Sequence, residues 1–120
     1  MLLVDTSVWV DHFRNGNGKL VNLLNGGHVL CHHFIIGELA CGYLDRREEI
    51  LTLLAELPHA KTADHCEVLD FIGHHSLMGR GIGYIDIHLL ASALLSNVKI
   101  WTLDKKLELI SERLQIKYIT

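Results

Sequence analysis

Short apolar runs alternate along the chain with longer stretches in which apolar residues recur at helical spacing. The runs are LLVD at 2–5, HVLC at 28–31, VKIWTL at 98–103 and IKYI at 116–119, with a weaker one, AKTA, at 60–63. Apolar runs of this length that are rich in β-branched and aromatic residues are typical of buried strands. The pattern therefore predicts a small sheet whose strands are separated by helices.

The stretches between the runs predict these helices. From Arg46 to Leu57 the apolar residues recur at helical spacing and form one stripe. Asp64 and Glu67 have the spacing of a capping box that opens another helix. The segment YIDIHLLASALL at 84–95 is apolar on nearly every side, which predicts a central helix, and a last helix is expected over 105–114.

Strands that alternate with helices predict an α/β fold with a mainly parallel sheet covered on both faces. The 120 residues contain no repeat, no low-complexity tract and no linker. A chain of this length can bury one core and is too short for two. We therefore expect a single domain over residues 1–120.

Two acidic residues follow predicted strands. Asp5 ends the first apolar run and Asp104 comes directly after the run at 98–103. In parallel sheets, ligand sites form beyond the carboxyl ends of the strands, so both carboxylates are expected at the same edge. Each of them also fits an ordinary helix N-cap, and a single acid does not separate the two roles.

Two further acids lie in apolar surroundings. Glu38 is part of FIIGELA at 34–40, and Asp86 is part of the segment at 84–95. Glu38 has a structural alternative in pairing with an arginine such as Arg80, and Asp86 has one as a first-turn acid favoured by the helix dipole. The occurrence of four such acids favours a shared site over four separate coincidences.

Four close carboxylates need a counter-charge, because like charges raise one another's pKa. Ligation by oxygen alone suits Mg²⁺ or Mn²⁺, which also bind phosphate oxygens. A water activated by such an ion attacks phosphorus in line while the ion neutralises the phosphoryl oxygens. The acids therefore predict a metal-dependent hydrolase acting on a phosphodiester such as RNA.

Hydroxyl groups and cations flank these acids. Thr6, Ser7 and Thr102 are candidates to hold the carboxylates in place, with ordinary helix-start chemistry as the alternative for the first two. Candidate contacts to RNA phosphates are Arg80, Lys105 and Lys106, although exposed cations are more often simply solvated.

Other polar and aromatic residues have commoner structural roles. His88 is two residues from Asp86, which on a helix turns it away from the acid and favours core packing over catalysis. Trp9, Trp101 and Tyr84 are candidates to stack on bases, but aromatic residues beside strands more often belong to the core.

Composition narrows the class of protein. Hydrophobic residues make up 49% of the chain and charged residues 21%, as in globular proteins. No apolar run approaches the roughly 18 residues of a membrane helix, and a charge at position 5 comes too early for a signal peptide, so a cytoplasmic protein is expected. The net charge of -3 provides no general attraction for nucleic acid, so a polyanionic substrate must be attracted locally or through a metal.

The three cysteines, Cys31, Cys41 and Cys66, have spacings that fit neither a disulfide framework nor a zinc ribbon. They are interpreted as reduced core residues.

Four segments resemble the PIN-domain ribonucleases, specifically the VapC toxins of bacterial toxin-antitoxin pairs. They are VDTSVWVDH, FIIGELACG, GRGIGYIDIHLLASALL and WTLDKKL, in the family's order and spacing. The resemblance places the family's four metal-binding acids at Asp5, Glu38, Asp86 and Asp104, and its hydroxyl near the fourth acid at Thr102.

This resemblance implies a PIN-like three-layer sandwich with a five-stranded, mainly parallel sheet flanked by helices. It also implies a homodimer that uses Mg²⁺ or Mn²⁺ and cleaves RNA endonucleolytically, with a VapB-type antitoxin that blocks the acidic pocket.

Two other classes of function remain as alternatives. A receiver-like signalling module also binds Mg²⁺ in an acidic pocket without nuclease activity, but it needs an acceptor Asp ending a middle strand and a lysine ending a late one. Neither HVLC nor AKTA ends in that way. A structural partner without catalysis is the third interpretation.

Overall fold

A parallel sheet lies at the centre of the computed structural model, which describes residues 1–119. Its strands are β1 (Leu2–Val4), β2 (Val29–Leu30) and β3 (Lys99–Trp101), in the order β2-β1-β3. Leu3 of β1 pairs with Leu30 on one side and with Ile100 on the other. These three strands confirm the predicted runs at 2–5, 28–31 and 98–103.

The runs at 60–63 and 116–119 do not form strands, and this prediction was wrong. Each approach to the sheet is a single parallel bridge, Cys31 with His59 and Ile100 with Lys117. After His59 the chain leaves the short β2, and the Lys61 N–H donates to Ser96 Oγ at 2.8 Å instead of to a strand. Within residues 1–119 the sheet therefore has three strands, where the family resemblance implied five.

Seven helices surround the sheet in the described part of the chain. They are α1 (Thr6–Asn15), α2 (Gly18–Asn25), α3 (His33–Cys41), α4 (Arg47–Glu56), α5 (His65–His74), α6 (Tyr84–Leu95) and α7 (Lys105–Arg113). The predicted helices correspond to α4, α5, α6 and α7, and the Asp64–Glu67 capping box of α5 is present. The pattern did not predict α2 or α3 as helices.

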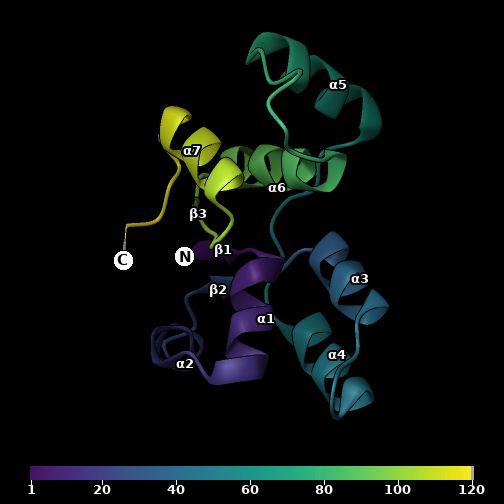
Figure 1. Cartoon of the computed structure of the whole chain (residues 1–120), viewed down its shortest axis with the longest axis vertical. Helices are drawn as coiled ribbons and strands as arrows, with labels where there is room; N and C mark the ends of the chain where they lie inside the picture. Colours follow the sequence, from purple (N-terminus) through teal and green to yellow (C-terminus); the bar gives the residue numbers. More distant parts are fainter. Residues whose placement is uncertain (120) are drawn as a thin grey trace.

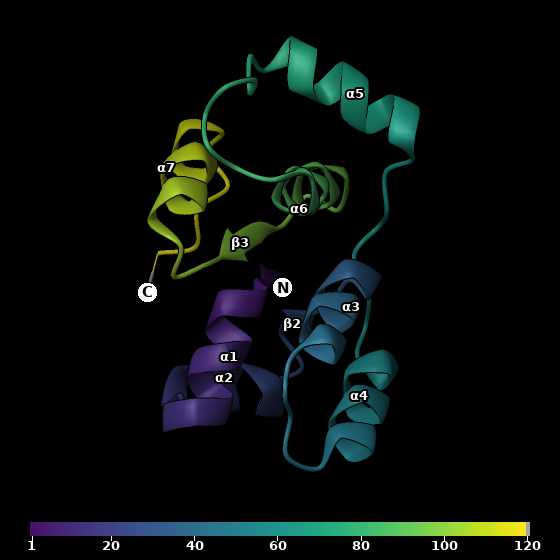
Figure 2. The ribbon, with the colours of Figure 1, turned by 45° about the vertical axis from the view of Figure 1, so that its right-hand side comes forward.

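The elements form three layers, as Figures 1 and 2 show. Helices α1 to α4 lie on one side of the sheet, α6 and α7 lie on the other, and α5 covers the outside of α6. In α6 every residue from Ile87 to Ala93 is buried, which confirms the central helix. The fold is therefore an α/β sandwich of the predicted kind.

The core contains both tryptophans, since Trp9 is 3% exposed and Trp101 is 6% exposed. Neither of them offers a face to a ligand. Cys31 is buried as expected, but Cys41 and Cys66 are exposed, so their placement in the core was wrong. All three cysteines are free. Within the described residues no helix has the length and apolar character needed to cross a membrane.

Candidate metal centre

Asp5 stands where β1 passes into α1. Its N–H donates to the Trp101 carbonyl at 2.9 Å, which extends the pairing of β1 with β3 and fixes the backbone. Its carboxylate is only 4% exposed, and Oδ2 accepts hydrogen bonds from Ser7 Oγ at 2.7 Å and from Thr102 Oγ1 at 2.8 Å. Oδ1 accepts no hydrogen bond from any described residue. Asp5 is thus both the N-cap of α1 and a carboxylate with one oxygen left available.

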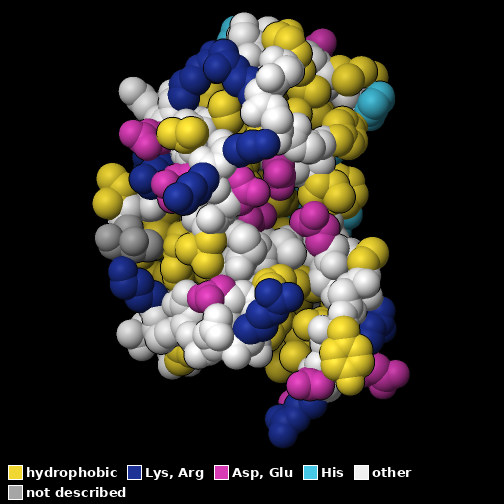
Figure 3. Space-filling model, viewed as in Figure 1, with side chains coloured by type: hydrophobic (Ala, Val, Ile, Leu, Met, Phe, Trp, Pro, Cys, Tyr) yellow, Lys and Arg dark blue, Asp and Glu magenta, His cyan; other side chains and the backbone are white. Residues whose placement is uncertain are grey.

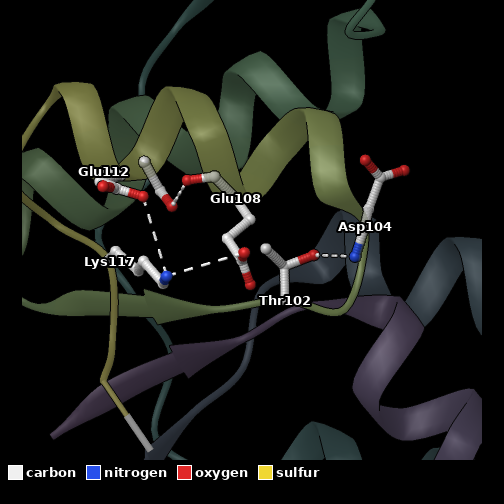
Figure 4. Close-up of polar contacts among 6 residues, drawn as sticks. Thr102, Asp104, Glu108, Glu112 and Lys117 are labelled. Atoms are coloured by element: carbon white, nitrogen blue, oxygen red, sulfur yellow. Dashed lines mark hydrogen bonds and ion pairs between the residues drawn. The ribbon is translucent and has the colours of Figure 1, made fainter.

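Asp104 has the same arrangement at the start of α7. Its Oδ1 accepts from the N–H groups of Lys106 at 2.9 Å and Leu107 at 3.1 Å. Its own N–H donates to Thr102 Oγ1 at 3.0 Å, as Figure 4 shows. Thr102 therefore connects the carboxylate of Asp5 with the backbone N–H of Asp104. Asp5 and Asp104 can each cap a helix and still bind a ligand, because capping occupies only one oxygen of each carboxylate.

Acids elsewhere on α7 are engaged differently. Glu108 and Glu112 lie 3.7 and 3.8 Å from Lys117, at a distance along the helix from Asp104 (Figure 4). These exposed ion pairs are surface features that contribute little to stability.

Glu38 comes from the middle of α3. Its Oε1 accepts from Thr6 Oγ1 at 2.7 Å, which ties α3 to the first residue of α1. The alternative pairing with Arg80 is not among the ion pairs of residues 1–119, and the Arg80 guanidinium donates from Nε to the Ser76 carbonyl at 3.1 Å. The ion pairs found within residues 1–119 include none of the four acids.

Asp86 shows that the four acids share one electrostatic environment. It lies half-buried in the first turn of α6. Burial, together with the negative charges of Asp5, Glu38 and Asp104, raises its pKa from 3.8 to about 6, while the Gly83 N–H acts in the opposite direction. Negative charges from three other chain segments thus act on Asp86, and within residues 1–119 none of the four carboxylates forms an ion pair.

This donor set suits a hard divalent cation. All four groups are carboxylates, and Asp5, Glu38 and Asp104 each have one oxygen engaged by the protein. As the side chains of residues 1–119 stand, no three His, Cys, Asp or Glu groups already enclose a position for an ion. A cation that keeps several of its waters, as Mg²⁺ usually does, fits such an open arrangement.

The family model described as "PIN domain" matches residues 2–112 of the chain. The chain belongs to the PIN-domain family. Two relatives are named Ribonuclease VapC32, from the Mycobacterium tuberculosis strains CDC 1551 / Oshkosh and ATCC 25618 / H37Rv. Each is 44% identical over 109 residues, which cover 90% of this chain and 88% of the relative. The resemblance to PIN-domain proteins of the VapC type is thereby confirmed.

Cations border the acidic site of this PIN domain on the side of α7. In Figure 3, Asp and Glu side chains gather in the middle of the face, and Lys and Arg side chains lie above them and to their left. Lys106 crosses the loop before α6, with its Nζ 3.1 Å from the place that a Cβ at Gly81 would occupy. Gly81 also has φ +78, so a side chain there is disfavoured on both counts. Arg80 and Lys105 are exposed.

The sequence interpretation missed His32, which joins the helices that carry Glu38 and Asp86. His32 is fully buried and caps α3, since its Nδ1 accepts from the Phe34 N–H at 3.0 Å. An accepting Nδ1 places the proton on Nε2, which donates to Ser92 Oγ of α6 at 3.1 Å. The sequence pattern indicated the capping role of His32 only weakly, because histidine is not among the common N-cap residues.

The PIN domain keeps His32 neutral. Burial, together with the neighbouring His33, His88 and His59, lowers its pKa from 6.5 to about 4. A depressed histidine pKa contributes stability that is complete above 6.5 and is lost as the pH falls toward 4. Asp86 changes the stability in the opposite direction, because its raised pKa favours the fold at low pH. The contributions of His32 and Asp86 to the pH dependence must therefore be separated by substitution.

We expect His32→Asn to lower the free energy of unfolding by about 2 kcal/mol at pH 7.5, because the buried Ser92 hydroxyl loses its partner while asparagine can still cap α3. Urea denaturation at pH 7.5 and pH 5 measures this. The difference between wild type and variant should shrink at pH 5, since only the wild type has a buried histidine to charge. An equal difference at both pH values would contradict the assignment.

Proposed function

We infer that this PIN domain is a metal-dependent endoribonuclease and the toxin component of a VapBC-type toxin-antitoxin pair. The observation that carries the inference is that the negative charges of Asp5, Glu38 and Asp104 help to raise the pKa of Asp86, while none of the four acids forms an ion pair within residues 1–119. The 44% identity to Ribonuclease VapC32 supports the same conclusion.

We propose that these four acids hold Mg²⁺ or Mn²⁺. When bound, such an ion neutralises phosphate charge and makes a water more acidic for in-line attack on phosphorus. The chain's own task is to hold the carboxylates in position before RNA arrives. Ser7 and Thr102 fix Oδ2 of Asp5, and Thr6 fixes Oε1 of Glu38, so each acid presents its second oxygen with little freedom to lose.

We further propose that Arg80, Lys105 and Lys106 contact RNA phosphates. They are exposed and lie at the edge of the acidic site, on the loop before α6 and the first turn of α7. With a net charge of -3 the chain has no general attraction for RNA, so such local cations are needed to seat the backbone.

The partners follow from the same family assignment. We propose a cognate VapB-type antitoxin that covers the acidic site, a homodimer, and a single PIN domain over residues 1–120. An antitoxin that shields the four carboxylates would stop cleavage without unfolding the enzyme.

Incubation of the purified chain with single-stranded RNA tests the proposal. With Mg²⁺ or Mn²⁺ present we expect internal cuts, seen as discrete shorter products on a denaturing gel. The same preparation, offered a small phosphodonor, should gain no phosphoryl group, because no acid ends β2 and no lysine ends β3. Labelling of the protein without any RNA cutting would favour the receiver-like alternative.

A further inference from the structure

A row of aromatic and imidazole rings runs from α3 to the start of α6. His33 lies 4.4 Å from Phe34, Phe34 lies 4.8 Å from His88, and His88 lies 4.6 Å from Tyr84, measured between ring centres. We call His33, Phe34, His88 and Tyr84 the ring ladder. Beyond its end, Tyr84 Oη shares a hydrogen bond of 2.6 Å with His65 Nδ1, which holds the tyrosine ring.

The four members of the ring ladder contact one another through their rings and not through hydrogen bonds. His88 is only 6% exposed, yet its Nδ1 has no hydrogen-bond partner within residues 1–119. An unsatisfied buried nitrogen is uncommon and requires an explanation. Here the imidazole lies between Phe34 and Tyr84, and its plane is nearly perpendicular to both rings.

Part of the ring ladder is open to solvent. Tyr84 is 43% exposed, His33 is exposed and Phe34 is partly buried. Exposed, pre-oriented rings of this kind offer π-faces on which unpaired bases stack without regard to sequence. The two tryptophans offer no such face, because both are in the core.

The ring ladder adjoins the acidic site along α3 and lies on the opposite side of α6 from Asp86. Phe34 is one turn before Glu38 on α3, so the two lie on the same face of that helix. On α6, Tyr84 and His88 lie about 200 degrees round the helix from Asp86, so RNA would pass round the amino end of α6. Gly83 provides no side-chain cap there, which leaves N–H groups that attract phosphate.

We propose that the ring ladder is a subsite for an unstacked base of single-stranded RNA, a few nucleotides from the scissile phosphate. The diameter of a helix is about 10 Å, and a few nucleotides of extended single-stranded RNA can span a distance of that order between the ladder and the acids. The inference rests on the proposed function, since it names how that substrate is held. The proposed subsite places the RNA phosphates on the α7 side of the four acids and one RNA base on the α3 side.

The test uses a short single-stranded RNA that the wild-type chain cuts, with 2-aminopurine introduced at each position in turn. Binding is measured in an Asp5→Asn background so that the RNA stays intact. We expect fluorescence quenching at a position a few nucleotides from the cut. Tyr84→Leu should abolish that quenching and weaken binding about tenfold, the usual effect of losing one stacked base.

Matched variants separate stacking from general damage. Tyr84→Phe keeps the ring and should bind within about twofold of the parent. Tyr43→Leu makes the same change at a tyrosine that is 95% exposed, and it should leave quenching unaltered. His33→Ala removes an exposed ring at the other end of the ladder and should weaken binding in the same direction as Tyr84→Leu. In the otherwise wild-type enzyme, Tyr84→Leu should raise KM and leave kcat unchanged.

Absence of quenching at every position would overturn the subsite, and so would equal binding by Tyr84→Leu and Tyr43→Leu. Either result leaves the proposed function standing as long as the wild-type chain cuts RNA. Failure of the proposed function is separate and visible: the wild-type chain leaves RNA intact, or the Asp5→Asn background still cuts it.

Discussion

Asp5→Asn is expected to reduce RNA cleavage about 1000-fold or more while the domain stays folded. The side-chain carbonyl of asparagine can take the place of Oδ2, where it still accepts from Ser7 and Thr102. The amide nitrogen then occupies the position of Oδ1, and a nitrogen that carries two protons cannot ligate a cation. Initial cleavage rates and a circular dichroism spectrum measure the two parts of this result.

Asp64→Asn is the matched control for Asp5→Asn. Asp64 is also an N-cap acid, it accepts from the Glu67 N–H at 2.8 Å, and asparagine preserves that role. Asp64 caps the amino end of α5, which covers the outside of α6. We expect the Asp64→Asn variant to cleave RNA at the wild-type rate. Parental activity in Asp5→Asn, or equal losses in both variants, would contradict the assignment of Asp5.

Asp86→Asn should also abolish cleavage, but with a gain in stability. Removing its charge relieves the repulsion that raises its pKa to about 6. Because the group is partly solvated, we expect the metal-free protein at pH 7.5 to gain only about 1 kcal/mol in free energy of unfolding. Urea denaturation in EDTA measures the gain, and a loss of stability would show that Asp86 has an attractive partner instead.

Chelation by EDTA is expected to stop cleavage completely, and excess Mn²⁺ or Mg²⁺ should restore it. The same cations should raise the melting temperature, because they bind the folded carboxylates and not the unfolded chain. The increase should be larger at pH 7.5 than at pH 5. Below about 6 Asp86 holds a proton in the metal-free fold, and that proton competes with the cation.

The direction of this pH effect follows from the raised pKa of Asp86. Stability due to its protonated form is complete below 3.8 and is lost as the pH rises through about 6. A cation replaces that loss, so its stabilising effect grows over the same interval. Asp86→Asn should show a smaller pH dependence, and Asp64→Asn should match wild type. Cleavage that persists in EDTA would rule out the metal mechanism.

The four acids proposed as the site could be selected from the sequence because their signals are local. Asp5 and Asp104 end apolar runs that become β1 and β3, and parallel strands deliver their carboxyl ends to one edge. Glu38 and Asp86 are charged residues among apolar neighbours, where an unpaired carboxylate is costly. Spacing alone likewise predicted the Asp64 capping box and the burial of α6.

Errors arose where an element depends on a partner remote in the chain. The runs at 60–63 and 116–119 have strand-like residues, but a strand forms only where a neighbour has unpaired backbone of sufficient length. β2 has two residues, and the chain leaves it at Lys61 for the Ser96 hydroxyl. The exposure of Cys41 and Cys66 likewise depends on which sides of α3 and α5 the neighbouring helices cover.

Local periodicity and the cost of burying charge were sufficient to indicate the α/β class, the central helix and the four carboxylates. These local signals did not predict the packing of α3 against α6, since it depends on contacts between residues more than fifty positions apart. This packing brings His32 to Ser92 and Phe34 to His88. It thereby forms both the hydrogen bond that links the helices of Glu38 and Asp86 and a central contact of the ring ladder. Such contacts are specified by the complementary shapes of whole helices, which no short segment contains.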